Sequence, residues 1–167
     1  MFEFIDHFYF VNLKLATLLY IQNSNDDYLM LERAREPNRG LLSPPGGKCE
    51  PAESPFKCAS REAFEECGII SKPSDWDLIG IVTEKNYPGI GDIMIFLMKY
   101  RHKLSNLPTE CNEGTFHFLK QTEIMDANIP VTDKLFIWNF VLNSGSKTFS
   151  VFIDCNKTPF ECITETI

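Results

Sequence analysis

The sequence is poor in positive charge. It has 167 residues with 16 Lys and Arg against 23 Asp and Glu, which gives a formal net charge of −7. Sequence-independent binding to a nucleic-acid backbone needs cationic patches that neutralise phosphates, so this composition argues against a nucleic-acid polymer as partner. A small phosphorylated ligand remains compatible, because a bound metal ion reverses the local sign of the charge.

The sequence also lacks the cysteine and histidine spacings of a zinc site. Its six cysteines form no C-x-x-C pair, and none of the three histidines lies at finger-like spacing from them. A chain of this length can build a core without disulfides, so we expect reduced thiols in a cytoplasmic protein. The first residues do not resemble a secretory leader, and no apolar run approaches the roughly 20 residues of a membrane span.

What is present indicates one globular domain over residues 1–167. Hydrophobic residues make up 44% of the chain, and 14 phenylalanines can supply much of a core. Strand-like and helix-like segments alternate without strict βαβ order, which predicts an α/β fold with a mixed sheet covered by helices on both faces. We expect strands at 8–21, 28–34, 76–84, 92–100 and 116–119, a helix at 132–142, and a closing hairpin with its turn at 156–157.

The segment 54–68 has the strongest helix signals. Ser54 can cap the first free amide groups, Pro55 suits the first helical position, and Gly68 suits the left-handed position past the end. On this helix Glu62, Glu65 and Glu66 fall within an arc of about 100°. We therefore expect a helix at 55–67 that carries three carboxylates on one side.

A merely solvated acidic face is the simpler reading of these glutamates, but their placement is unfavourable for stability. Glu62 and Glu66 form a like-charge i,i+4 pair, which costs roughly 0.2–0.5 kcal/mol. All three lie near the helix C-terminus, where the dipole disfavours negative charge by roughly 0.3–1 kcal/mol per group. Converging carboxylates are what a hard divalent cation such as Mg²⁺ binds, so a bound metal would turn this repulsion into ligation.

The residues before the helix fit the same interpretation. Gly46 and Gly47 let the backbone approach a ligand or metal closely. Glu53 lies eight residues before Arg61, and an ion pair between them would tie the loop to the helix in a structural role.

Residues 47–69 resemble the Nudix box, G-x5-E-x7-R-E-U-x-E-E-x-G-U, in which U is a bulky aliphatic residue. The nine specified positions are Gly47, Glu53, Arg61, Glu62, Ala63, Glu65, Glu66, Gly68 and Ile69. Ala63 is the one departure, and it affects packing and not ligation. Outside the box, weaker likenesses to the MutT-like, 8-oxo-dGTP diphosphatase-like branch lie in LERAREPNRG, CNEGTFHFLKQTEI, PVTDKLFIWNFV and FSVFID.

The resemblance implies a Nudix fold, an α/β/α sandwich around a mixed sheet, with Mg²⁺ or Mn²⁺ as cofactor. It implies that Glu65 and Glu66 are the principal metal ligands, with the carbonyl of Gly46 as a further ligand. Glu62 matches a position that is either a ligand or the water-activating base, and the choice of base between Glu62 and Glu65 stays open. Gly47, Glu53, Arg61 and Gly68 have structural roles.

Outside the box the resemblance suggests fewer residues. Glu113 is the candidate for an extra metal-binding acid, with Glu110 and Glu84 as rivals. Arg33 matches a basic position that can touch phosphate, and a solvent-facing residue on an edge strand is the alternative. Asp133 either contacts a purine edge or caps the last helix.

The implied function is hydrolysis of a nucleoside diphosphate linked to another group. We expect a nucleoside triphosphate, such as an oxidised purine like 8-oxo-dGTP, to be converted to the monophosphate and pyrophosphate. The alternatives are an ADP-ribose or nucleotide-sugar pyrophosphatase and a non-catalytic nucleotide-binding module. The expected partner is a small nucleotide, and the oligomeric state stays open, a homodimer included.

Overall fold

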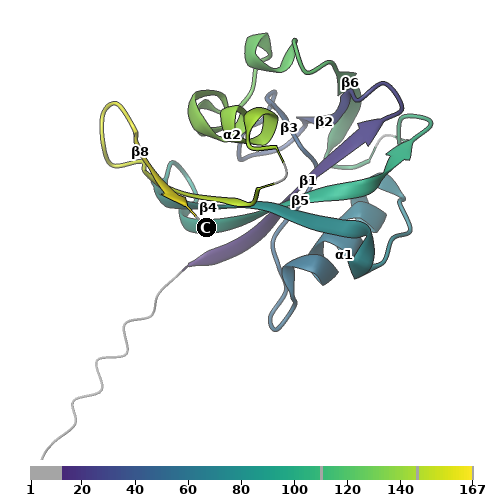
Figure 1. Ribbon diagram of the computed structural model, residues 1–167, viewed down its shortest axis with the longest axis horizontal. Helices are drawn as coiled ribbons and strands as arrows, with labels where there is room; N and C mark the ends of the chain where they lie inside the picture. The colour runs from purple at the N-terminus through teal and green to yellow at the C-terminus, as the bar shows by residue number, and fades with distance from the viewer. Residues whose placement is uncertain (1–12, 110, 146, 167) are drawn as a thin grey trace, which may run out of the picture.

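The computed structural model describes residues 13–109, 111–145 and 147–166. They form an eight-stranded mixed sheet with helices on both faces (Figure 1). The elements, in chain order, are β1 Lys14–Asn23, β2 Tyr28–Arg33, β3 Leu42–Ser43, α1 Pro55–Cys67, η1 Pro73–Asp75, β4 Trp76–Tyr87, β5 Gly91–Leu104, β6 Gly114–Leu119, η2 Ile124–Asp126, η3 Asp133–Ile137, α2 Trp138–Asn143, β7 Phe149–Asp154 and β8 Glu161–Thr166.

The strand order is β3-β2-β1-β5-β4-β7-β8, with β6 paired to β2. The pairs β1–β5 and β4–β7 are parallel, whereas β1–β2, β4–β5 and β7–β8 are antiparallel. The expected α/β class, mixed sheet and closing hairpin are therefore confirmed. Residues 8–12 of the first expected strand lie outside the described residues, and the two-residue β3 was not foreseen because so short a segment has no periodicity.

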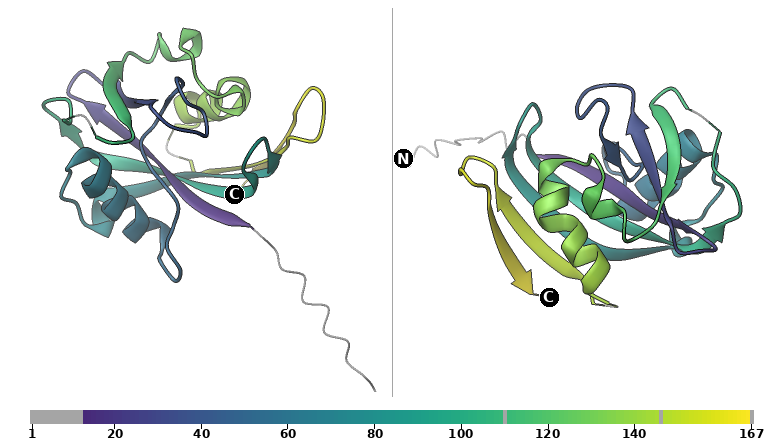
Figure 2. Two further views of the ribbon diagram at one scale, coloured as in Figure 1. Left: turned by 180° about the vertical axis from the view of Figure 1, so that it is seen from behind. Right: turned by 90° about the horizontal axis from the view of Figure 1, so that it is seen from above.

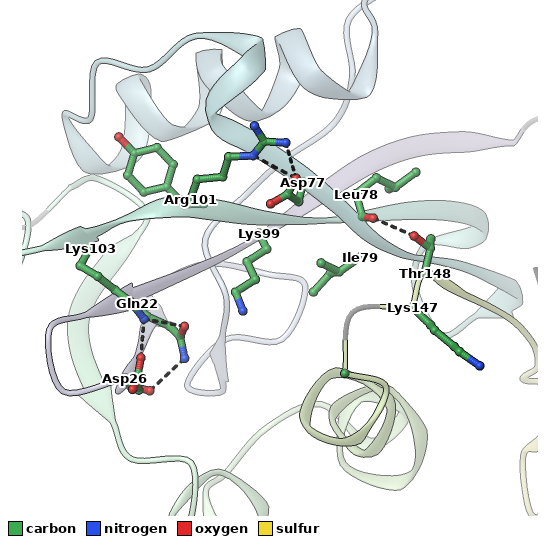
Figure 3. A pocket seen from close by; sticks show the side chains of 12 residues that line it. Gln22, Asp26, Asp77, Leu78, Ile79, Lys99, Arg101, Lys103, Lys147 and Thr148 are labelled. Atoms are coloured by element: carbon green, nitrogen blue, oxygen red, sulfur yellow. Dashed lines mark hydrogen bonds and ion pairs between the residues drawn. The ribbon is translucent and has the colours of Figure 1, made fainter.

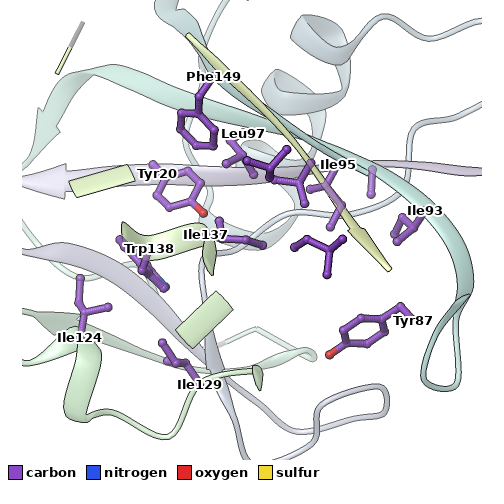
Figure 4. Packing of buried hydrophobic residues seen from close by; sticks show 14 of the residues in the cluster. Tyr20, Tyr87, Ile93, Ile95, Leu97, Ile124, Ile129, Ile137, Trp138 and Phe149 are labelled. Atoms are coloured by element: carbon purple, nitrogen blue, oxygen red, sulfur yellow. The ribbon is translucent and has the colours of Figure 1, made fainter. Parts of the chain in front are cut away.

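Two hydrophobic clusters occupy opposite faces of the sheet, since alternate residues of a strand point to opposite sides. Beneath α1, the cluster includes Leu19, Ala59, Ala63 and Trp76. On the other face, α2 packs against the cluster that contains Tyr20, Val82 and Ile95 (Figure 4). The two views of Figure 2 show α1 on one face of the sheet and α2 on the opposite face. No helix within the described residues is long and apolar enough to cross a bilayer.

Helix α1 begins and ends as its sequence predicts. The Ser54 hydroxyl accepts a hydrogen bond from the Lys57 N–H at 3.3 Å, and Gly68 adopts the left-handed conformation with φ of 66°. Cys58, Ala59 and Ala63 are fully buried, which fixes the helix against β1 and leaves the glutamates at its margin.

The last helix differs from the single capped helix expected over 132–142. A π-helical turn, η3, precedes α2, and neither Thr132 nor Ile137 makes a side-chain capping hydrogen bond. Thr132 already has helical backbone angles, and Lys134 N–H donates to the Pro130 carbonyl at 2.9 Å, so the helical turn starts upstream of Asp133. The capping role considered for Asp133 is wrong, because this buried residue is the first residue of η3 and the turn has no side-chain capping hydrogen bond.

Candidate active site

The glycine loop before α1 is held along strand β1 by backbone hydrogen bonds. Thr17 N–H donates to the Gly47 carbonyl and Leu19 N–H to the Pro45 carbonyl, both at 2.8 Å. A Cβ on Gly46, whose φ is 143°, would lie 2.2 Å from the Thr17 carbonyl oxygen, and a Cβ on Gly47 would lie 2.4 Å from Glu62 Oε1. Both glycines are required by this close approach, which brings the loop against the carboxylates of α1.

Arg61 organises the acidic side of α1. Its guanidinium binds both carboxylate oxygens of Glu53, at 3.0 and 2.8 Å, so the expected Glu53–Arg61 ion pair is present. The same group contacts Glu62 Oε1 at 2.7 Å, Glu65 Oε2 at 3.0 Å and the Lys48 carbonyl at 3.0 Å. This bidentate pair lowers the pKa of Glu53 to about 2.

The surroundings of Glu62 and Glu66 favour the charged carboxylate less than those of Glu53 do. Burial raises the pKa of Glu62, although Arg61 opposes the shift. Burial also raises the pKa of Glu66 to about 7, with further contributions from the negative charges of Glu62 and Glu113. The Gly46 N–H donates a hydrogen bond to Glu66 Oε2 at 2.9 Å, which offsets part of the effect of burial on the pKa of Glu66.

Glu62, Glu65, Glu66 and Glu113 line one cavity, together with Cys111 and Asn112. Glu113 is brought there by β6, whose first residue pairs with Arg33, and its carboxylate lies 3.6 Å from Arg35. The rival Glu110 lies outside the described residues. The second rival, Glu84, is not among the residues that line this cavity; it lines the apolar cavity described below.

The chemistry of this donor set fits a hard divalent cation. Four carboxyl groups line one cavity, and burial raises the pKa values of two of them, Glu62 and Glu66. As the side chains lie, however, no three acidic, cysteine or histidine groups of the described residues converge closely enough to hold a metal ion. Arg61 and the Gly46 N–H occupy the oxygens that would have to turn inward.

A second cavity, of about 190 Å³, adjoins the glycine loop and is mainly apolar. Its walls include Leu18, Ile90, Ile93 and Ile95, with Gly46 and Gly47 at one side. Arg33, Glu84 and Asp133 reach it from β2, β4 and η3. Gly46 and Gly47 line this cavity, and they contact Glu66 and Glu62 of the acidic cavity, so the glycine loop lies between the two cavities.

Arg33 is partly buried, and its Nε donates to the Pro37 carbonyl at 2.8 Å. Strand β2 is paired with β1, β3 and β6, so the alternative of an edge-strand position is wrong. Sequence reasoning missed the Tyr87–Asn38 hydrogen bond at 3.1 Å on the wall of the same cavity. A signal for it was absent, because the two residues lie 49 positions apart in the chain.

A larger cavity, of about 760 Å³, contains none of these residues (Figure 3). It is lined by Lys99, Arg101, Lys103 and Lys147, and two of these cations are paired with Asp26 and Asp77. The volume of a cavity therefore does not identify the candidate active site, because the four carboxyl groups of the acidic cavity lie elsewhere.

Comparison with known proteins agrees with this geometry. The NUDIX domain family matches residues 12–137, so the chain belongs to the NUDIX family. The MutT protein of Bacillus halodurans has a similar structure, with a TM-score of 0.71, 25% identity, and coverage of 90% of this chain and 94% of that one. The NUDIX domain of Shewanella oneidensis NrtR, solved with ADP ribose, shares the fold with a TM-score of 0.63 at 13% identity, over 79% of this chain and 86% of that one.

Among curated proteins, diphosphoinositol polyphosphate phosphohydrolase 3-beta of Bos taurus is 37% identical over 59 residues. That match covers 35% of this chain and 35% of the relative, so the chain spans about a third of that relative's length. The assignment to the Nudix superfamily and its MutT-like branch is confirmed. Members of this family generally use divalent metal ions.

Proposed function

We propose that this protein hydrolyses a nucleoside triphosphate to the monophosphate and pyrophosphate with Mg²⁺ or Mn²⁺ as cofactor. An oxidised purine nucleotide such as 8-oxo-dGTP is the candidate substrate. The observation that carries the proposal is the adjacency of two cavities at Gly46–Gly47, one lined by four carboxyl groups and the other mainly apolar. A nucleotide has the matching halves, a polyphosphate and a flat base.

In this proposal Glu65, Glu66 and the Gly46 carbonyl hold the metal, with Glu62 and Glu113 beside them. None of the hydrogen bonds among the described residues engages the Gly46 carbonyl, whereas the Gly46 N–H and the Gly47 carbonyl are both occupied. A divalent ion bound there neutralises phosphate charge and makes a water molecule easier to deprotonate.

The chain's own residues supply the proton acceptor and the alignment. Glu62 or Glu65 accepts the proton of the attacking water, and both contact Arg61, which sets their direction. Arg33 lies at the apolar cavity beside the glycine loop, where its charge can meet a phosphate oxygen. The Arg33–Pro37 contact restrains the guanidinium before the ligand arrives.

A substrate panel tests the proposal most directly. The full chain is incubated with Mg²⁺ or Mn²⁺ and with nucleoside triphosphates, 8-oxo-dGTP, ADP-ribose, a nucleotide sugar and a diphosphoinositol polyphosphate, and the released pyrophosphate and orthophosphate are measured separately. We expect the highest kcat/KM for a purine triphosphate, with pyrophosphate as product. A clear preference for ADP-ribose, the ligand of the NrtR domain, would favour that alternative. Binding without turnover of any compound would favour a non-catalytic module.

A further inference from the structure

The cavity of about 760 Å³ is basic, whereas the chain as a whole carries a formal net charge of −7. Of the described residues that line it, four carry a positive charge and two a negative charge: Lys99, Arg101, Lys103 and Lys147 against Asp26 and Asp77. It shares no lining residue with the acidic cavity or with the apolar cavity beside the glycine loop. The proposed catalytic function therefore leaves this concentration of positive charge unexplained.

Two of the four cations have no anionic partner in the part of the chain that the structure describes. Neither Lys99 nor Lys147 forms an ion pair there. Figure 3 shows both side chains without a drawn contact. A single exposed lysine is ordinarily just hydrated. These two line a concave surface together with two further cations, and like charges around a cleft concentrate anions within it.

The other two cations are only loosely held by their partners. Arg101 contacts Asp77 with side chains that are 54% and 48% exposed, and Lys103 contacts Asp26 with side chains that are 41% and 64% exposed. Ion pairs between exposed side chains contribute little to stability, so a ligand of higher negative charge can take over these cations. The Arg101 guanidinium presents Nε and Nη2 side by side, and both now contact Asp77 Oδ1 at 3.0 and 2.6 Å. Such a fork also matches the oxygens of a phosphate group.

The cavity is built on the sheet, which fixes where its cations begin. Lys99 lies in the middle of β5, where its backbone pairs with Tyr20 of β1 on one side and with Asp77 of β4 on the other. Lys103 Nζ donates to Oε1 of the buried Gln22 at 2.9 Å. Groups carried by paired strands are placed more precisely than groups on loops, so less ordering is needed when a ligand binds.

We propose that this cavity is a second, non-catalytic site that binds a small compound with several phosphate groups. Its volume lies within the range of about 300–1,000 Å³ that is typical of small-molecule sites. Because the four cations come from β5 and from the segment before β7, a chain of phosphates can contact more of them than a single phosphate can. A long polyanion would also meet the acidic remainder of the surface, which favours a small ligand over a nucleic-acid polymer.

Calorimetric titration of the full chain with inorganic tripolyphosphate tests this proposal. A chelator keeps the solution free of divalent ions, so the acidic cavity repels the probe. We expect saturable binding that is at least about 10-fold tighter than that of orthophosphate and weakens as salt is added. The double variant Lys99→Gln/Lys147→Gln should bind tripolyphosphate at least about 10-fold more weakly, because it removes the two unpaired cations. Each single variant should show part of this loss, and circular dichroism should show the same fold in all.

The matched control is Lys57→Gln/Lys157→Gln, which makes the same change in net charge at two exposed lysines that do not line the cavity. It should bind tripolyphosphate within about 2-fold of the original protein. Equal weakening in the two double variants would overturn the proposal, as would unchanged binding after loss of Lys99 and Lys147, or undetectable binding to the original protein. Tighter binding of a short single-stranded RNA or of an acidic peptide than of tripolyphosphate would overturn the ligand class.

Two further measurements separate this site from the candidate active site. Glu65→Gln should leave tripolyphosphate binding in the chelator unchanged, and Lys99→Gln/Lys147→Gln should keep the metal-dependent turnover of the original protein. Loss of tripolyphosphate binding in Glu65→Gln would place the probe at the acidic cavity and overturn the proposal. The proposed hydrolysis can fail in the substrate panel without affecting any of these binding results, because the two sites share no lining residue.

Discussion

Two groups of acidic residues in this molecule have the same side-chain chemistry but different neighbours. The glutamates of α1 surround Arg61, which contacts Glu53, Glu62 and Glu65. Glu84 and Asp133 have no cation, and Glu84 Oε1 has no partner at all among the described residues. In the proposed function the first group exchanges its arginine contacts for a metal ion, whereas the second group has no cation among the described residues to exchange.

The difference shows that burial by itself does not define the role of a carboxyl group. Glu62 is 8% exposed and Asp133 is 6% exposed, so their burial is nearly equal. Arg61 opposes the rise in the pKa of Glu62, but nothing comparable opposes the rise for Asp133. The neighbouring charge therefore opposes the effect of burial at Glu62, whereas at Asp133 the charge of Glu84 adds to it.

The largest effect is expected when the α1 carboxylates are neutralised. Glu65→Gln and Glu66→Gln should each lower kcat by about 100-fold or more, because each removes a charged ligand of the proposed metal site. Circular dichroism should show an unchanged fold, since the substitutions keep the side-chain size. Glu50→Gln, an exposed change in the loop before the helix, serves as the control. Near-normal rates in both variants would refute the metal assignment.

Removal of the shared cation should have the next largest effect. Arg61→Ala leaves Glu53, Glu62 and Glu65 without their common partner, so we expect a loss of about 1–3 kcal/mol in the free energy of unfolding and a decrease of about 10- to 100-fold in kcat. Chemical denaturation and steady-state kinetics measure the two effects. Arg61→Lys should restore charge but not the bidentate contact, and so recover only part of the loss. Full activity in Arg61→Ala would contradict the positioning role.

Neutralising Glu84 should stabilise the protein at high pH. Its pKa is about 7 in the folded protein and near 4.5 when exposed, so between these values the folded form binds more protons than the unfolded form. The free energy of unfolding therefore falls as pH rises through this window. Glu84→Gln removes this contribution and should be more stable than the original protein at pH 8 by about 1–3 kcal/mol, with little difference at pH 4.

Denaturation curves at pH 4, 6 and 8 check this prediction. If Glu84→Gln were destabilised by the same amount at every pH, the proposed contrast with the α1 glutamates would be wrong. Such a result would mean that a cation or a hydrogen-bond donor stabilises the charged form of Glu84 in the folded protein. Glu32→Gln provides the control for a change at an exposed site.

The smallest effect is expected at Glu113. Its ion pair with Arg35 is long, at 3.6 Å, and the Arg35 side chain is 63% exposed, so Glu113→Gln should change stability by less than about 0.5 kcal/mol. If Glu113 completes the metal site, the variant should need about 3- to 10-fold more Mg²⁺ for half-maximal activity. A metal titration of the rate decides this, and an unchanged metal requirement would remove Glu113 from the ligand set.

The sequence by itself determined the local features of this protein. The helix over 55–67, its Ser54 cap and its Gly68 terminus follow from backbone preferences of single residues, which act over a few positions. The spacing within residues 47–69 was sufficient to indicate the Nudix family, the glycine approach and the Glu53–Arg61 pair. The residues involved all lie within one loop and one helix, so the local backbone geometry determines how they are placed relative to one another.

Only the tertiary structure decided the surroundings of the isolated acids. Glu84 and Asp133 are 49 residues apart, and they meet because the chain returns through β6, η2 and η3 to cover the far face of the sheet. A carboxyl group can cap a helix, face solvent, form an ion pair or keep an oxygen without a hydrogen-bond partner. Which of these occurs depends on helices and strands that are distant in the sequence, and local sequence patterns do not predict where those lie. For this reason the sequence offered Glu84 only as a rival metal ligand and left Asp133 between a purine contact and a helix cap, whereas the folded chain places both in the cavity beside the glycine loop.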